Sequence, residues 1–173
     1  DGSGRLVKLL DLAGQAYHYS YDAANNLSTV STPDGKTKTY HYNESALTNG
    51  TNLPNALTGI TDENGVRYVN YSYDSSGRAI DEVFPAVGTN TNRYQLSFGS
   101  NSTTVTDPLG TARTYNFQTI LGVVKSTGSS QPGGSGCGAS SSLLSYDANG
   151  NVSSRTDFNG NVTTYTWDLT RNL

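Results

Sequence analysis

The feature that most constrains this sequence is a glycine followed at a fixed distance by two aromatic residues. In the segment that ends at Trp167, aromatic side chains stand five and seven positions after Gly160. The spacing recurs after earlier glycines, in one copy shifted by one residue. The repeated aromatic residues are Tyr19, Tyr21, Tyr40, Tyr42, Tyr71, Tyr73, Tyr115, Phe117, Tyr165 and Trp167. Such self-similarity predicts an array of similar structural units.

Each aromatic pair predicts a β-strand with one aromatic face. Residues two apart in a strand point to the same side of the sheet, and the residue between them points to the other side. Turn residues recur every ten to twelve positions, with Asn-Gly steps at 64, 149 and 159. Asn-Gly favours the type I′ turn, in which both central residues have positive φ. The prediction for residues 1–173 is therefore an all-β array of antiparallel β-hairpins with almost no helix.

Two stretches interrupt the repeat. Residues 44–57 contain an Asn-Gly-Thr sequence and Pro54, and we expect an irregular insertion there. Residues 126–142 consist almost entirely of Gly, Ser, Thr and Gln around Pro132. This composition predicts a flexible, Gly/Ser-rich loop.

The composition argues against several classes of protein. Only 14% of the residues are charged, the net charge is -3, and Lys and Arg are scattered singly, so no basic stripe is available for nucleic acid. No apolar run approaches the ~20 residues that a membrane span needs. No motif for a cofactor stands out. Since a signal-peptide pattern is also absent, we expect a piece of a longer chain whose targeting information lies elsewhere.

Residues that could carry out chemistry do not converge in the sequence. Asp62 and Glu63 are neighbours, so on a strand they would point to opposite faces. His18 and His41 each lie between two tyrosines, which predicts a solvent-side strand position. Cys137 lies in the Gly/Ser-rich stretch without a nearby histidine that could activate it. We therefore predict no catalytic residue and no enzyme activity.

Two segments carry oxygen-bearing side chains at every second position, as in a calcium loop. Both lack the Gly and Glu that such a loop has at its sixth and twelfth positions. A hairpin turn is the favoured interpretation, and calcium binding is the weaker alternative. The candidate ligands are Asp147, Asn149, Asn151, Asp157, Asn159 and Asn161.

One copy of the repeat resembles a known family. Residues 71–80 read Tyr-Ser-Tyr-Asp-Ser-Ser-Gly-Arg-Ala-Ile, which is similar to the YD repeat of Rhs proteins, and less complete copies extend the resemblance over essentially the whole chain. In bacterial polymorphic toxins, the encapsulating component of insecticidal toxin complexes and teneurins, such repeats form a sheet that spirals into a hollow shell. The resemblance implies a curved, spiralling sheet that is a fragment of a β-shell.

The same resemblance implies a structural function. The chain would form part of the wall that encloses a C-terminal effector, so its partners would be that effector and the rest of the parent shell. The parent would be secreted or displayed on the bacterial cell surface.

Two further expectations come from the residues themselves. The tyrosines are interpreted first as cross-strand pairs that stabilise the sheet. The alternative is an extracellular carbohydrate-binding or adhesion module whose exposed tyrosine faces contact cell-surface glycans. Edge strands without a neighbour would in addition permit self-association.

Overall fold

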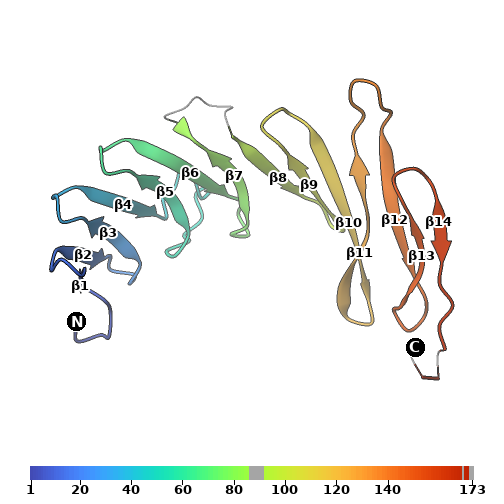
Figure 1. Cartoon of the computed structure of the whole chain (residues 1–173), viewed down its shortest axis with the longest axis horizontal. Helices are drawn as coiled ribbons and strands as arrows, with labels where there is room; N and C mark the ends of the chain where they lie inside the picture. Colours follow the sequence, from blue (N-terminus) through green and yellow to red (C-terminus); the bar gives the residue numbers. More distant parts are fainter. Residues whose placement is uncertain (86–91, 169, 172–173) are drawn as a thin grey trace. The chain divides into compact units, whose positions relative to one another are not determined.

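The computed structural model describes residues 1–85, 92–168 and 170–171. This part of the chain contains fourteen β-strands and no α-helix. The strands follow one another in the sheet in the order of the sequence, β1 to β14, as successive antiparallel hairpins (Figure 1). The predicted all-β array of antiparallel hairpins is confirmed. No helix in the described residues has the length and apolarity that a membrane crossing requires.

The chain divides into two compact units, residues 1–95 and 96–173. The first unit holds β1 (Lys8–Leu10), β2 (Ala16–Tyr21), β3 (Leu27–Ser31), β4 (Thr37–Tyr42), β5 (Leu57–Thr61), β6 (Arg67–Tyr73) and β7 (Ala79–Val83). The second holds β9 (Ser102–Thr106), β10 (Ala112–Ile120), β11 (Val123–Gln131), β12 (Ser140–Tyr146), β13 (Val152–Thr156) and β14 (Val162–Thr164). The boundary falls within β8 (Tyr94–Phe98).

The two faces of the first unit differ in chemistry. Tyr40, Ile60 and Val69 lie opposite one another on β4, β5 and β6, and form part of an apolar face. His41, Gly59 and Asn70 form the neighbouring row, which belongs to the polar face. In the described residues, Val69 is the one apolar side chain that is fully buried. The sheet is therefore held together mainly by interactions between neighbouring strands.

Six hairpins turn through an Asp-x-x-Gly sequence. In the first of them, the Gly14 N–H donates to the Asp11 carbonyl oxygen at 3.0 Å, and Gly14 has a φ of 76°. Asp11 Oδ1 accepts the N–H groups of Ala13 and Gln15, each at 2.9 Å. The carboxylates that form the same pair of bonds in other turns are those of Asp1, Asp22, Asp62, Asp74, Asp107, Asp147 and Asp157.

This geometry corrects the predicted turn type. At the three Asn-Gly steps only the glycine has positive φ, as Gly65, Gly150 and Gly160 show, and the preceding asparagine does not. A type I′ turn needs positive φ at both residues, so the prediction was wrong. The turns are type I turns followed by a left-handed residue, because the aspartate oxygen binds the N–H groups of the residues two and four positions later and favours that conformation.

A β-bulge recurs in four hairpins whose first strand ends in a tyrosine. In β2–β3, Ser20 lies opposite Thr29 and Tyr21 lies opposite Leu27, so Ser28 is an extra residue. The same shift occurs between β4 and β5, between β6 and β7, and between β12 and β13. Bulges increase the local twist of a sheet. Further register shifts occur between β5 and β6 and between β10 and β11.

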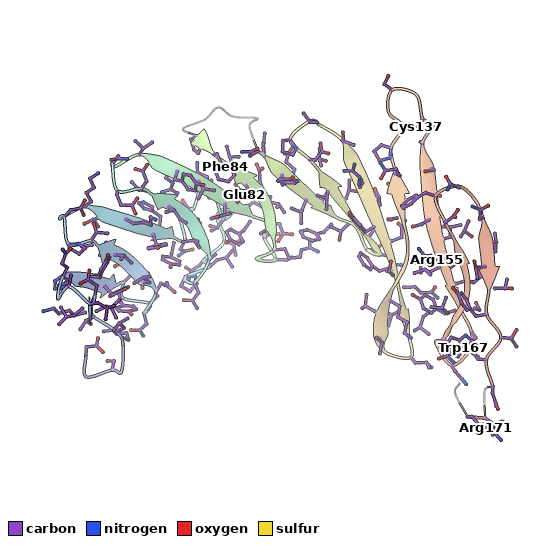
Figure 2. The ribbon with its side chains drawn as sticks, in the orientation of Figure 1. Glu82, Phe84, Cys137, Arg155, Trp167 and Arg171 are labelled. Carbon is purple, nitrogen blue, oxygen red and sulfur yellow. The ribbon has the colours of Figure 1, made fainter. Side chains whose placement is uncertain are left out.

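The predicted flexible loop over residues 126–142 was wrong for most of its length. Residues 126–131 belong to β11 and residues 140–142 to β12, so the connection is limited to residues 132–139, with Cys137 near its tip (Figure 2). Serine side chains support this pairing: the Ser129 N–H donates to Ser142 Oγ at 3.2 Å. Cross-strand hydroxyl contacts stabilise a sheet even where apolar side chains are scarce.

Candidate functional site

In five repeats, the aromatic residue that precedes the turn donates a hydrogen bond to the neighbouring strand, whereas Phe117 has no donor group. The Tyr21 hydroxyl donates to the Leu6 carbonyl oxygen at 2.9 Å, and the Tyr42 hydroxyl donates to the Leu27 carbonyl oxygen at 3.1 Å. Further bonds of this kind run from Tyr73 to Leu57 at 2.8 Å, from Tyr146 to Ser126 at 2.5 Å, and from Trp167 Nε1 to Val152 at 2.7 Å. We call Tyr21, Tyr42, Tyr73, Tyr146 and Trp167 the aromatic ladder.

In the first unit, the residue opposite one ladder tyrosine accepts the hydrogen bond of the next ladder tyrosine. Leu27 lies opposite Tyr21 in the β2–β3 pair, and its carbonyl oxygen accepts the hydroxyl of Tyr42 from the next repeat. Leu57 in turn lies opposite Tyr42 and accepts the hydroxyl of Tyr73. Burial raises the pKa of both Tyr42 and Tyr73, so each hydroxyl keeps its proton and remains a donor. The repeats that contain Tyr42 and Tyr73 are therefore each bonded to the repeat before them.

The Tyr-Asp dipeptide combines two tasks in adjacent residues. Tyr73 bonds to the preceding strand, whereas Asp74 caps the turn that leads to the following strand. Hydrogen bonds from the Arg78 and Ser76 N–H groups, together with the Arg78 side chain, hold the pKa of Asp74 below its usual value. Because the carboxylate is the acceptor, the turn needs Asp74 in its charged form.

The candidate calcium ligands lie in two of these turns. Asp147 Oδ1 accepts the N–H groups of Asn149 and Asn151, and Asp157 Oδ1 accepts those of Asn159 and Asn161. The side-chain amide of Asn161 donates to Asp157 Oδ2 at 2.9 Å, and that of Asn151 donates to Asp147 Oδ2 at 3.3 Å. The carboxylate oxygens are thus used to hold the turns. In the described part of the chain, no group of three or more His, Cys, Asp or Glu side chains could hold a metal ion.

In the structure the insertion comprises residues 43–56, between the end of β4 and the start of β5. A polar cluster that the sequence analysis did not predict lies where it joins the sheet. Arg67 donates to Glu44 Oε2 at 2.5 Å and to the Thr58 carbonyl oxygen at 3.2 Å, and Thr58 Oγ1 donates to the same Glu44 oxygen at 2.7 Å. His41 Nε2 lies 2.8 Å from Thr61 Oγ1. We call these five residues the polar cluster.

Electrostatics within the polar cluster favour one charge pair. Burial alone would raise the pKa of Glu44, but the hydrogen bonds from Arg67 and Thr58 outweigh it and leave the pKa lowered. Burial lowers the pKa of His41, and the positive charge of Arg67 acts in the same direction. The cluster therefore contains charged Glu44 and Arg67 beside a histidine that disfavours its charged form.

The polar cluster anchors the insertion to the sheet. Outside the cluster, the Tyr73 N–H donates to the Leu47 carbonyl oxygen at 2.7 Å, and the Asn26 side chain donates to the Pro54 carbonyl oxygen at 2.8 Å. The insertion thus contacts three successive repeats. Glu44 and Arg67 are 23 residues apart, and no local pattern in the sequence marks them as partners.

The second unit contains an open groove of about 820 Å³. It lies where β10 and β11 extend beyond their pairing with β9 and β12. Aromatic rings and amide side chains both contribute to its lining, which includes Asn101, Asn116, Phe117, Gln118, Leu144 and Tyr146. Such a mixture suits a polar ligand with apolar faces.

A comparison with known protein families matches two segments of the repeat array. The family model described as "RHS Repeat" matches residues 1–37 and 146–173. These two segments are similar to RHS repeats. The matched residues include the first turns of the array, with Tyr21-Asp22, and its last ones, with Tyr146-Asp147 and Trp167-Asp168. The matched segments thus contain Tyr21, Tyr146 and Trp167 of the aromatic ladder.

One solved structure is similar in fold to this chain. A chain of the Photorhabdus luminescens Tc holotoxin pore aligns with a TM-score of 0.52 and 13% sequence identity, over 89% of the present chain and 8% of that chain. A chain in the crystal structure of TcdB2-TccC3-Cdc42 aligns over 91% of the present chain and 10% of its own, at 11% identity and a TM-score of 0.39. The chain thus spans a small part of these proteins. No curated protein matches it.

Proposed function

We propose that this RHS-repeat chain forms part of the wall of a β-shell that encloses a C-terminal effector. The observation that carries the proposal is the aromatic ladder. Its five members bond to main-chain carbonyl oxygens of the neighbouring strand and so support the sheet, although Val69 is the one fully buried apolar side chain in the described residues. A wall of a container needs this property, because one face of it meets solvent and the other meets the enclosed space.

The similarity in fold to a chain of the Tc holotoxin pore supports this proposal. The Tc holotoxin pore contains a chain with the same arrangement of strands, of which the present chain corresponds to a small part. On this proposal, the partners are the remaining repeats of the parent chain and its effector, and the parent is secreted or displayed on the bacterial surface.

The test is limited proteolysis of the complete polypeptide that contains these repeats. The expected result is that its C-terminal module is cut far more slowly in the intact polypeptide than as an isolated module. A variant with Tyr42→Phe and Tyr73→Phe should speed the cutting, because two ladder bonds are lost. Tyr68→Phe is the matched control, since Tyr68 lies outside the ladder. Equal cutting rates for the enclosed and the isolated module would contradict the proposal.

A second candidate function is carbohydrate binding by an adhesion module. The groove in the second unit supports it, because Phe117 and Tyr146 line it together with Asn101, Asn116 and Gln118. A glycan array with the folded chain tests this function. Binding that Asn116→Ala and Gln118→Ala abolish would favour it, and an array without binding would count against it.

A further inference from the structure

One copy of the repeat holds an additional residue, and the structure shows its position. The two aromatic residues of this copy follow their glycine by six and eight positions instead of five and seven. In the pairing of β5 with β6 the register moves by one residue between Ile60 and Thr61, so Tyr68 is the additional residue of a β-bulge. Among the described strands, the corresponding pairs β1–β2, β3–β4, β9–β10 and β13–β14 have no such shift. The bulge is therefore specific to this hairpin.

The bulge directs Tyr68 toward the apolar face of the sheet. Neighbouring residues of a regular strand point to opposite faces. Val69 lies opposite Ile60 on the apolar face, yet Tyr68 also lines a pocket together with Ile60 and Tyr40. A bulge permits this arrangement, because it redirects a side chain. The Tyr68 ring packs edge-on against Phe84, which Figure 2 labels, with the ring centroids 5.4 Å apart. The bulge thus gives the pocket a supported aromatic wall.

The pocket measures about 380 Å³ and lies over β4, β5 and β6 in the first unit. Its volume suits a small chemical group, since pockets for small molecules span roughly 300–1,000 Å³. Two tyrosine rings and one aliphatic side chain form apolar walls, and three charged side chains complete the lining. The lining residues are Lys38, Tyr40, Ile60, Asp62, Glu63 and Tyr68.

The charges of the pocket do not cancel. Lys38 Nζ lies 3.1 Å from Glu63 Oε1, and this hydrogen bond raises the pKa of Lys38, so the ammonium group stays charged. Asp62 Oδ1 accepts the N–H groups of Asn64 and Val66 and so holds the turn. Among the described residues, none donates to Asp62 Oδ2 and none forms an ion pair with Asp62. The pocket therefore retains one carboxylate without a cationic partner.

A flat organic cation matches both the rings and the free carboxylate. The faces of tyrosine rings attract cations. Guanidinium is planar, stacks on aromatic rings, pairs with carboxylates through two parallel hydrogen bonds, and is more weakly hydrated than an ammonium group. We infer that the pocket lined by Tyr40, Tyr68 and Asp62 binds a guanidinium group, the group that arginine carries.

Two sources could supply this group, a free guanidinium compound or an arginine side chain of a polypeptide. Both place the same chemistry between the two rings and Asp62. The inference is independent of the proposed enclosure of an effector, because it depends on the pocket alone. It is also separate from the carbohydrate candidate, whose groove belongs to the second unit.

The experiment is an NMR titration of the full chain with ¹³C-labelled tyrosine rings. The first probe is N-acetylarginine N-methylamide, and its matched control is the citrulline analogue, which has the same shape without the charge. We expect the arginine compound to shift the signals of Tyr40 and Tyr68, with those of Tyr115 in the second unit unchanged. The citrulline compound should bind about tenfold more weakly, because the cation–π contact and the charge-assisted hydrogen bonds are lost.

A second arm of the titration distinguishes the two sources. Agmatine carries the same guanidinium group without peptide amides. Tighter binding of the arginine compound would assign the pocket to a polypeptide side chain, and tighter binding of agmatine would assign it to a free compound. Both results support the guanidinium site. Methyl glucoside tests a neutral sugar in the same pocket, and a sugar that binds more tightly than the arginine compound would overturn the inference.

Variants of the charged residues test the electrostatic argument. Asp62→Asn keeps an oxygen for the turn but removes the charge, and it should weaken binding about threefold, as expected for an exposed ion pair. Asp11→Asn is the matched control, because it makes the same change in a turn outside the pocket. Lys38→Ala should tighten binding about threefold, because it frees the Glu63 carboxylate for the ligand.

Variants of the bulge residue test the aromatic wall. Tyr68→Phe keeps the ring and should keep the binding, whereas Tyr68→Leu should weaken it about two- to fivefold. If Tyr68→Leu disturbs folding, the exposed change Lys38→Ala still tests the inference. Three results would overturn it: equal binding of the arginine and citrulline compounds, equal losses in Asp62→Asn and Asp11→Asn, or weaker binding in Lys38→Ala.

Discussion

Tyr73 and Leu57 lie at facing ends of neighbouring strands, and the Tyr73 hydroxyl donates to the Leu57 carbonyl oxygen at 2.8 Å. Leu57 also lies opposite Tyr42 of the preceding repeat. Leu57 thus connects two tyrosines that are 31 positions apart in the sequence. A sheet with few buried apolar side chains thereby gains a contact between repeats that does not depend on a second layer.

Tyr73→Phe should lower the free energy of unfolding by about 1 kcal/mol, because it removes a hydrogen bond and leaves the Leu57 carbonyl oxygen without its donor. Urea denaturation followed by circular dichroism measures the change. Tyr68→Phe is the control: its ring packs edge-on against Phe84 and is kept. Equal stability of the two variants would contradict the role of the ladder.

Asp74→Ala should lower the melting temperature by about 2–4 °C, because the N–H groups of Ser76 and Arg78 lose their acceptor. Asp74→Asn keeps an oxygen at the same position and should lose less. The measurement is thermal denaturation of the three proteins. The idea fails if the alanine and asparagine variants melt at the same temperature.

Stability should fall steeply in acid. Hydrogen bonds in the turns hold the pKa values of Asp22, Asp74, Asp107 and Asp157 below the ordinary value of 3.8. The folded state therefore binds protons less readily than the unfolded state, so this stability is fully present above about pH 4 and is lost as the pH falls through the lowered values. Urea titrations between pH 7 and pH 2 measure it. Asp74→Asn should flatten the slope below pH 4, and an unchanged slope would refute the assignment.

Gly14→Ala should cost about 1 kcal/mol, because Gly14 has a φ of 76° and an alanine there is strained even though open space surrounds it. Gly14→Asn should cost less, since Asn25 occupies the corresponding position of the next turn with a φ of 67°. Gly138→Ala is the control, because Gly138 has open space and no positive φ. Chemical denaturation should rank the variants in this order, and a neutral Gly14→Ala would contradict it.

Gly59→Ala should release the insertion from the sheet. A Cβ atom at Gly59 would occupy the space of the Arg67 guanidinium group, which holds Glu44. Protease cleavage within residues 43–56 should become faster and the protein less stable. In an Arg67→Ala background the same substitution should have little further effect, because the clash is absent. Additive effects of the two substitutions would show that they act separately.

The repeat could be predicted from the sequence because its signals are local. The period-two pattern of Tyr71 and Tyr73, and the Asp-x-x-Gly turns beside such strands, involve residues within a few positions of one another. The type of turn was missed, because the Asp62 side chain rather than the Asn64-Gly65 step decides the backbone conformation.

The polar cluster could not be predicted in this way. His41, Glu44, Thr58 and Arg67 come from separate segments of the sequence. The nearest signal in the sequence is an acidic residue, Glu44, at the start of the insertion and a basic residue, Arg67, after its end. The Ser-rich strands around residue 130 were likewise missed, because their composition is typical of a loop and their pairing across β11 and β12 overrides it.

By itself, the sequence determined the all-β class, the hairpin repeat and the positions of the aromatic residues, because alternation and turn formation act over short distances along the chain. The tertiary structure alone decided that Tyr42 bonds to Leu27, that Ser28 forms a bulge, and that Arg67 holds Glu44. These depend on register between strands, and register is set when whole strands pair rather than by any one segment.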